Sequence, residues 1–230
     1  MASSPTIPAV SEPNQDAAWR AAFRAEEWAG ELRVNLVRLV AIAVFYGNHL
    51  VNFYLRDIGL SSEFHLTVTC IAAAWAAAAL AIHIVLARRG NPHYLKYAAL
   101  GWDVFMTTSL IVFSDGPQSP FLILLLLIII TAPLRLNLRL VWIASLAVML
   151  SYGVACGHSK WVRPETRVPV QDHAIFLLAL ATGGLLAGQC VRQSRRFARD
   201  HAERLLATSE IADTPSDVQE DLLNQKGETS

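Results

Sequence analysis

The sequence is poor in cysteine, and it lacks the short motifs that mark common enzyme active sites. Its three cysteines, Cys70, Cys156 and Cys190, form no C-x-x-C pair, so neither a disulfide framework nor a zinc site is indicated. No nucleophile elbow, phosphate-binding loop or metalloprotease motif is present. The sequence therefore predicts no hydrolase or transferase chemistry, and we expect that the chain is not an enzyme.

An excess of charge of one sign is also missing. Nineteen basic and nineteen acidic residues give a formal net charge of zero. No long basic face exists outside the flanks of the apolar blocks, so no nucleic-acid partner is expected. The N-terminus has no basic region followed directly by an apolar run, and a cleavable signal peptide is therefore not predicted.

Apolar residues, by contrast, are abundant and gather in long blocks. They make up 53% of the chain, and the mean hydropathy is +0.37. Six blocks each approach the roughly 20 residues that a helix needs to cross hydrocarbon. We place them at about 36–55, 66–87, 95–113, 120–136, 139–156 and 173–192. The predicted fold class is all-α: a polytopic membrane protein with a six-helix transmembrane bundle over 36–192, in contact with lipid.

The basic residues between the blocks predict how the chain is oriented. One side of the membrane receives Arg33, Arg38, Arg88, Arg89, Lys96, Arg135, Arg139, Arg192, Arg195, Arg196 and Arg199. The opposite loops hold fewer, and the only sizeable one runs from Gly157 to Asp172. The positive-inside bias therefore places both termini in the cytoplasm of a bacterium, with the bundle in its inner membrane.

The flanks of the bundle differ in character. Residues 1–14 show no apolar pattern and are predicted to be disordered. Residues 15–35 are predicted to form an amphipathic juxtamembrane helix, lying either on the membrane surface or packed on the bundle. After Arg192 the helical pattern has no breaker, so a cytoplasmic helix over 193–210 is expected, followed by a flexible acidic tail over 211–230.

An acid lies inside the third apolar block. Asp103 is followed one turn later by Thr107, and no basic residue is predicted at the same depth. A lone carboxylate in an apolar span is costly and marks a partner or a site. Asp103 is either a structural acid bonded to Asn48, Asn52 or Gln189, or a ligand or proton site facing a cavity.

The histidines suggest a second kind of site. His49, between Asn48 and Asn52, is predicted in the first block, with His65 and His173 near the same side. His83 and His93 lie near the other side. Since a membrane haem needs one imidazole on each face of its iron, His49 with His173 or His65, and His83 with His93, could hold two b-type haems. The alternative is that these histidines are interfacial residues or polar contacts between helices.

Small residues predict close helix approaches. The second block is rich in alanine, and the sixth contains Gly184-x-x-x-Gly188. Such patterns let helices pack tightly in lipid. Packing within the chain and a homodimer interface both explain them.

The stretch from Asp103 to Arg139 carries a longer motif. It combines an acid, a threonine four residues on, a turn S-D-G-x-x-S-P-F, a Leu/Ile run, and A-x-L-R-x-x-L-R. The motif includes Asp115, Gly116, Ser119, Pro120, Arg135 and Arg139. It resembles the six-helix membrane anchors that precede the catalytic domains of some bacterial class III adenylate cyclases and sensor histidine kinases. The resemblance covers roughly residues 33–205.

The resemblance implies a sensor or receptor module whose sixth helix continues as a signalling helix. Some cyclase anchors of this type are regarded as quinone-responsive dihaem domains, which makes quinone and haem b candidate ligands. No cyclase or kinase domain would fit after Arg192. We therefore expect an anchor that acts through a separate cytoplasmic effector or a dimer mate, or that is cut from a longer protein.

The functional prediction is a membrane sensor that responds to a small apolar ligand, a quinone or the membrane redox state near Asp103 and His49. The alternative is a dihaem b-type cytochrome in membrane electron transfer. A weaker alternative is a small transporter that uses Asp103.

Overall fold

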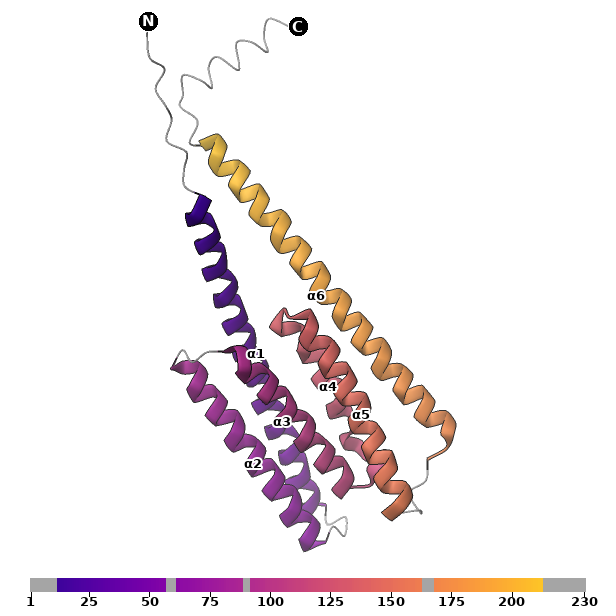
Figure 1. The fold of residues 1–230 in the computed structure, drawn as a ribbon. Helices are drawn as coiled ribbons and strands as arrows, with labels where there is room; N and C mark the ends of the chain where they lie inside the picture. The colour runs from indigo at the N-terminus through magenta and orange to yellow at the C-terminus, as the bar shows by residue number, and fades with distance from the viewer. Residues whose placement is uncertain (1–11, 57–60, 89–91, 163–167, 213–230) are drawn as a thin grey trace, which may run out of the picture. The chain divides into compact units, whose positions relative to one another are not determined.

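The computed structural model describes residues 12–56, 61–88, 92–162 and 168–212, with side chains described from 28 to 198 apart from residues 92 and 93. Every regular element in these ranges is helical, which confirms the predicted all-α class (Figure 1). The α-helices are α1 Glu12–Tyr54, α2 Ser62–Ala87, α3 Pro92–Phe113, α4 Ile123–Thr131, α5 Leu138–Val162 and α6 Val170–Ala212. Three short 3₁₀ helices are η1 Gly116–Gln118, η2 Pro120–Leu122 and η3 Ala132–Arg135.

The chain forms two compact units, and each is described by itself. The first comprises residues 1–188, and in it α1 packs on α2, α2 on α3, and α3 and α4 on α5. The second comprises residues 189–230, whose described part is the end of α6. In this second unit the side chains of Arg192, Arg196 and Phe197 are exposed.

Apolar side chains are exposed on many helices. Large exposed examples are Leu66, Leu80, Phe105, Ile130, Leu146, Leu150 and Leu178. In the described residues, four segments are long and apolar enough to cross a membrane: Trp28–Tyr54, Ser62–Ala87, Leu138–Val162 and Val170–Ala198. Such a surface is costly in water and favourable in lipid, so it supports the predicted membrane location.

The first helix differs from the prediction. In place of a juxtamembrane helix over 15–35 and a separate span over 36–55, α1 is one continuous helix, and residues 12–14 belong to it. The chain has no proline between Pro13 and Pro92 that could end it. Gly30 does not break the helix but serves packing: a Cβ there would lie 2.5 Å from the carbonyl oxygen of Leu134 in η3.

The fourth span is not a uniform α-helix over 120–136. Only Ile123–Thr131 is α-helical, with η2 before it and η3 after it. Pro120 starts η2 and Pro133 lies in η3, and each proline removes an amide donor that an α-helix would use. Leu136 then adopts a left-handed conformation, with φ of 49°, and ends the segment.

Helices α2, α5 and α6 are longer than the predicted spans. Ser61 caps α2 by accepting a hydrogen bond from the amide of Phe64, so α2 starts at Ser62. Helix α5 continues to Val162, which makes the predicted loop after Gly157 shorter. Residues 1–11 and 213–230, predicted to be disordered or flexible, lie outside the described residues.

Candidate functional site

Four polar residues form a stripe along the middle of α1. Trp28, Glu31, Asn35 and Arg38 are spaced by three or four residues, so they share one face of the helix. We call this stripe the polar seam. Each member bonds across to another helix, and Glu31, Asn35 and Arg38 are all buried. The stripe therefore faces the interior of the bundle.

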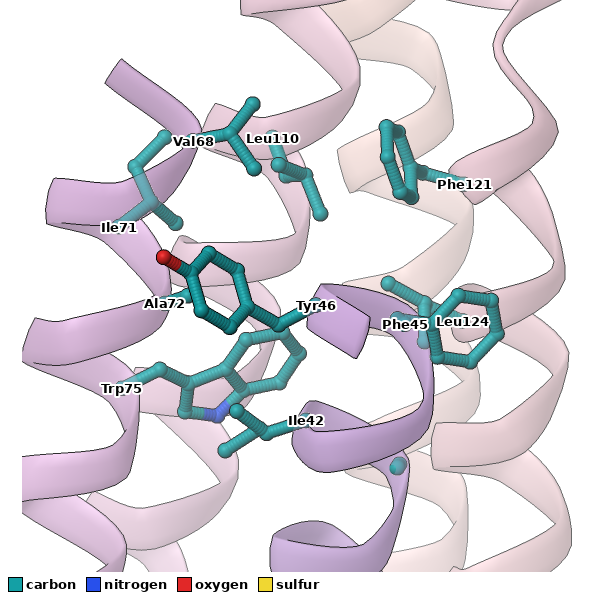
Figure 2. Close-up of a pocket in the computed structure, with 11 residues that line it drawn as sticks. Ile42, Phe45, Tyr46, Val68, Ile71, Ala72, Trp75, Leu110, Phe121 and Leu124 are labelled. Atoms are coloured by element: carbon teal, nitrogen blue, oxygen red, sulfur yellow. The ribbon is translucent and has the colours of Figure 1, made fainter. Parts of the chain in front are cut away.

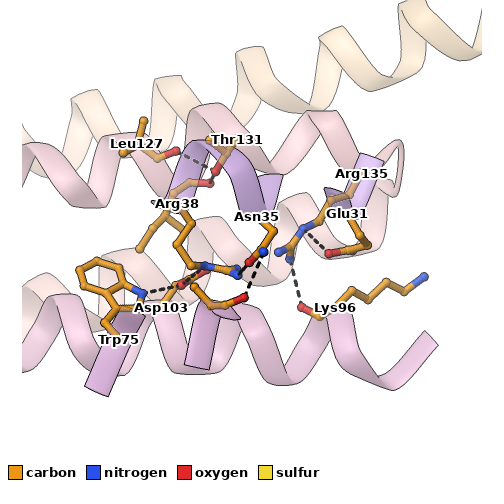
Figure 3. A network of polar contacts seen from close by, with 11 residues as sticks. Glu31, Asn35, Arg38, Trp75, Lys96, Asp103, Leu127, Thr131 and Arg135 are labelled. Atoms are coloured by element: carbon orange, nitrogen blue, oxygen red, sulfur yellow. Dashed lines mark hydrogen bonds and ion pairs between the residues drawn. The ribbon is translucent and has the colours of Figure 1, made fainter. Parts of the chain in front are cut away.

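The centre of the seam is a bidentate ion pair between α1 and α3 (Figure 3). Arg38 Nε donates to Asp103 Oδ1 and Arg38 Nη2 donates to Asp103 Oδ2, both at 2.6 Å. Arg38 Nη1 donates to Asn35 Oδ1, also at 2.6 Å. From α2, Trp75 Nε1 donates to Asp103 Oδ1 at 2.9 Å. Both oxygens of the carboxylate are therefore held by nitrogen donors.

The position of Arg38 within α1 explains how this pair forms. Helix α1 starts well before the predicted span over 36–55, so Arg38 lies inside a continuous helix. The prediction placed Arg38 at the start of the span and no basic residue at the depth of Asp103. The structure corrects the second point, since Arg38 is the buried partner of Asp103.

Near its N-terminal end the seam bonds to η3 and α2, and η3 in turn bonds to α3. Arg135 of η3 lies 3.3 Å from Glu31, measured from Nε to Oε2, and its Nη1 donates to the carbonyl of Lys96 at 3.0 Å (Figure 3). Trp28 Nε1 donates to the carbonyl of Leu86 at 3.0 Å. These bonds connect α1 with η3 and α2, and η3 with α3.

Asn35 lies between the two ion pairs and also reaches α2. Its Nδ2 donates to the carbonyl of Ala79 at 3.1 Å, while its Oδ1 accepts from Arg38. Asparagine can both donate and accept, so one side chain satisfies two buried partners. An apolar residue at this position would leave both without that bond.

The ion pair lies beside two adjoining pockets of the first unit. One is apolar and is formed by α1, α2, α3, η2 and α4 (Figure 2). The other has a volume of about 30 Å³ and is lined by Arg38 and Asp103 among mostly apolar neighbours. Ala41, Trp75 and Leu124 line both. Trp75 therefore contacts the apolar pocket and bonds to the ion pair at once.

The threonines after Asp103 have different environments. Thr107 is completely buried, and in the described part of the chain its Oγ1 has no hydrogen-bond partner. Thr108 Oγ1 bonds to the carbonyl of Val104 and lies 2.5 Å from Ser151 Oγ of α5. Thr107 thus shares a helix with Asp103 without joining its network, whereas Thr108 connects α3 to α5.

The structure does not bring His49, Asn48 or Asn52 to Asp103. His49 is eleven residues beyond Arg38 on α1, which corresponds to roughly 16 Å. Its Nε2 lies 3.1 Å from His65 Nδ1 of α2, in a cluster with Phe53 and Phe64. Asn48 is exposed, and Asn52 accepts a hydrogen bond of 3.4 Å from Arg56. Gln189 belongs to the other unit.

The described histidines do not fit a bis-histidine haem as they are placed. An iron between two imidazoles would hold the ligating nitrogens about 4 Å apart, since each metal–nitrogen bond is about 2 Å. His49 and His65 instead bond directly to each other, with rings inclined by 15°. His173 Nδ1 lies 2.7 Å from the hydroxyl of Tyr152. His83 is exposed, and the side chain of His93 lies outside the described residues.

The motif over 114–139 divides between the two ends of the bundle. Gly116 has φ of +58°, and a Cβ there would lie 3.3 Å from Ser159 Cβ, so glycine suits this turn. Ser119 Oγ accepts from the amide of Phe121 and starts η2, with Pro120 next. Asp115 and Arg139 are exposed, while Arg135 joins the polar seam. The motif therefore combines a turn before α4 with an arginine after α4 that pairs with Glu31 of the polar seam.

Most of the seam was not predicted, although the sequence contains a signal for it. Glu31, Asn35 and Arg38 recur at helical spacing within the pattern E-x-x-x-N-x-x-R. Placed on one face and extended into the apolar span, they form a stripe that must find partners. Trp75, by contrast, lies among alanines, and nothing in its neighbourhood in sequence points to Asp103.

Residues 26–185 match the family described as the PilS-like transmembrane domain, a six-helix membrane domain. The match covers more than half of the chain, begins two residues before Trp28, and includes both partners of the central ion pair. A search of curated proteins and a search of solved structures found no match. The predicted kinship with sensor-kinase anchors is confirmed at this level, while the cyclase part gains no support. The chain therefore belongs to the PilS-like transmembrane domain family and is a multi-pass membrane protein with a sensing module of the sensor-kinase type.

Proposed function

We propose that this module is non-enzymatic, reads the state of the membrane through the Arg38–Asp103 ion pair, and signals through α6. The input would be a small apolar ligand, a quinone or the redox state of the membrane. The output would reach a cytoplasmic effector such as a kinase, or a second copy of the chain. The observation that carries the proposal is the buried ion pair, whose partners come from different helices.

A buried ion pair suits a two-state element for a physical reason. Separating the two partners leaves each charge in a medium that solvates it poorly. Partly separated arrangements are therefore unfavourable, and the pair has two main states, bonded and separated. Trp75 and Asn35 hold the made state from α2 and α1. A ligand that bound only one arrangement would shift the balance between the two states.

The continuity of α6 supports its role as the output. It runs as one helix from Val170 to Ala212 and so extends beyond the predicted span over 173–192. In its first part, Gly184 packs so closely on Ser145 of α5 that a Cβ would clash with it. A movement of α5 would therefore displace α6 at this point.

The proposal includes an orientation with both termini in the cytoplasm of a bacterial inner membrane. Arg38, Lys96 and Arg135 are buried in the bundle and no longer count as loop charges. The exposed cations Arg33, Arg88 and Arg139 remain, and Arg192, Arg195 and Arg196 follow the apolar part of α6. The positive-inside rule still favours the same side.

Two other functions predicted from the sequence gain less support. Transport through Asp103 would need an acid free to exchange protons or ligands, and both its oxygens already accept hydrogen bonds. Dihaem electron transfer would need the histidines to rearrange. A visible absorption spectrum of the purified protein, with or without a bis-histidine Soret band, separates that alternative from sensing.

Disulfide crosslinking along residues 195–208 tests the proposal. Single cysteines would be introduced there after Cys70, Cys156 and Cys190 are replaced by serine. We expect Asp103→Asn to change the pattern of crosslinks in membranes, since it removes the charge with little change of shape. Asp115→Asn, which alters an exposed acid in the turn after α3, serves as the control. Identical patterns in parent, Asp103→Asn and control would overturn the proposal.

A further inference from the structure

We propose that the apolar pocket beside Trp75 binds a linear hydrocarbon chain, and that Trp75 transmits its occupancy to Asp103. The binding itself stands on the geometry of the pocket. Its consequence for signalling rests on the function proposed above. The inference thus names the class of ligand and the residue that reads it.

The lining of the pocket comes from five elements that are distant in sequence. The volume is about 30 Å³, so the pocket holds only a short part of a chain. The main side chains around it are Ile42, Phe45, Tyr46, Ile71, Trp75 and Phe121 (Figure 2). On α2 the wall includes Ala72, whose single methyl group leaves room that a larger residue would fill. The pocket is therefore a small apolar recess that would take part of a chain rather than a whole ligand.

The polar atoms of the lining are already bonded. The hydroxyl of Tyr46 donates to Thr69 Oγ1 at 3.3 Å, and the indole nitrogen of Trp75 donates to Asp103. A ligand with a polar group in this pocket would lose its hydrogen bonds to water and find no partner here, which is costly. A saturated chain loses nothing. The chemistry of the pocket thus selects hydrocarbon.

The surroundings supply such chains. The pocket is built from the apolar segments Trp28–Tyr54 and Ser62–Ala87 together with α4, which is almost purely Leu and Ile. An acyl chain of a membrane phospholipid and the chain of a free fatty acid share the same chemistry. Both are therefore candidate sources, which an experiment can separate.

Trp75 connects this pocket to the ion pair. Its ring lines the pocket, and its nitrogen lies 2.9 Å from Asp103 Oδ1. Displacing the indole by about 0.7 Å away from Asp103 would lengthen this contact beyond hydrogen-bonding distance. Asp103 Oδ1 would then keep only Arg38 as a donor among the bonds described. A chain that moves the ring away from Asp103 would therefore weaken the network that holds α1 to α3.

Photocrosslinking of the full-length protein in nanodiscs tests the binding. One arm uses a phosphatidylcholine with a diazirine on its acyl chain, and the other uses a diazirine fatty acid added to unlabelled nanodiscs. Mass spectrometry then locates the label. We expect label on pocket residues of α1 and α2, above all Tyr46, Ile71 and Trp75. The arm that labels them identifies the source.

A matched pair of substitutions sharpens the result. Ala72→Leu fills the pocket, whereas Ala73→Leu adds the same atoms on the exposed side of α2. We expect Ala72→Leu to reduce pocket labelling about tenfold and Ala73→Leu to leave it unchanged. The site of labelling in the unsubstituted protein decides the matter if Ala72→Leu fails to fold. Label confined to exposed residues such as Leu80 and Ile84 in both arms would overturn the inference.

The experiments test chain binding and signalling independently of each other. If the pocket is labelled but the α6 crosslinks do not respond to Asp103→Asn, the chain site stands and the sensing function falls. If the crosslinks respond but the pocket takes no label, sensing stands and this ligand is wrong. Both results positive, with Trp75→Phe uncoupling chain binding from the crosslinks, would support the complete inference.

Discussion

The two halves of the part of α1 from Trp28 to Tyr54 hold the bundle together by different means. From Trp28 to Arg38 the helix uses charged and polar side chains, each bonded to a partner on another element. From Ile42 to Phe53 it uses apolar and aromatic packing, with the His49–His65 contact as the main polar one. Partners in the first half are specific and hard to exchange, whereas the second half lines the apolar pocket. One helix can thus combine a specific polar connection with an apolar surface.

Removing one member of the ion pair is the most direct test of this difference between the halves. Asp103→Leu leaves the guanidinium of Arg38 buried without its carboxylate, and we expect a loss of about 3–5 kcal/mol in the free energy of unfolding. Arg38→Leu should cost a similar amount. Unfolding in mixed micelles by SDS titration, followed by circular dichroism, measures both.

The double variant and a control in the second half of α1 complete this test. Arg38→Leu combined with Asp103→Leu removes both charges and should recover most of the stability. Asn48→Leu changes an exposed polar residue in the second half of α1 and should have little effect. Simple additivity of the two single losses would contradict the ion pair as the cause.

Two glycines of α1 compare the halves with the same substitution. At Gly30 a Cβ would lie 2.5 Å from the carbonyl oxygen of Leu134, whereas at Gly47 nothing lies within 4 Å. We expect Gly30→Ala to destabilise by about 1–3 kcal/mol because backbone must shift. Gly47→Ala should stabilise by roughly 0.5–1 kcal/mol through helix propensity. The same SDS titration gives both values, and equal effects would remove the distinction.

The histidine contact offers a smaller effect in the second half. His49→Phe keeps the ring packing among Phe53 and Phe64 but removes the hydrogen bond to His65, so we expect a loss of about 1 kcal/mol. A double-mutant cycle with His65→Phe isolates the pairwise part. A coupling energy of zero would show that packing alone holds the two helices there.

The smallest expected effect is at the edge of the apolar pocket. The Tyr46 hydroxyl bonds to Thr69 at 3.3 Å, which is long for an O–H···O contact. Tyr46→Phe should therefore cost roughly 0.5 kcal/mol or less. A thermal unfolding curve of the purified protein in detergent is sufficient to measure it. A loss as large as that of Asp103→Leu would mean that the pocket region is as rigid as the seam.

Hydropathy predicted the six helices because each apolar run is long and bounded by polar residues. It did not predict how far before the first span the helix starts. Glu31 lowers the local hydropathy, so the span was predicted to begin after it. In the structure Glu31 pairs with Arg135 and Arg38 pairs with Asp103 inside the bundle, on a helix that starts at Glu12. A hydropathy scale that scores each residue alone cannot detect charges that are paired across helices.

The candidate site was predicted only in part for a related reason. Asp103 stood out because a carboxylate in an apolar run is rare. Its partners could not be found from distance along the chain, since Arg38 and Trp75 lie 65 and 28 residues away. Asn48 and Asn52 seemed suitable by type, but helical rise places them beyond reach. Partner choice in a helical bundle is decided by depth, which needs correct helix ends.

The 3₁₀ turns around α4 have a consequence for bilayer thickness. A 3₁₀ residue rises about 2.0 Å and an α residue about 1.5 Å, so the span from Pro120 to Arg135 reaches about 27 Å where a pure α-helix would reach about 24 Å. Membranes differ in hydrocarbon thickness by a similar few ångströms. A change in the length of this span would move Arg135 relative to Glu31. The polar seam thus lies at the end of the span where such a change would have its effect.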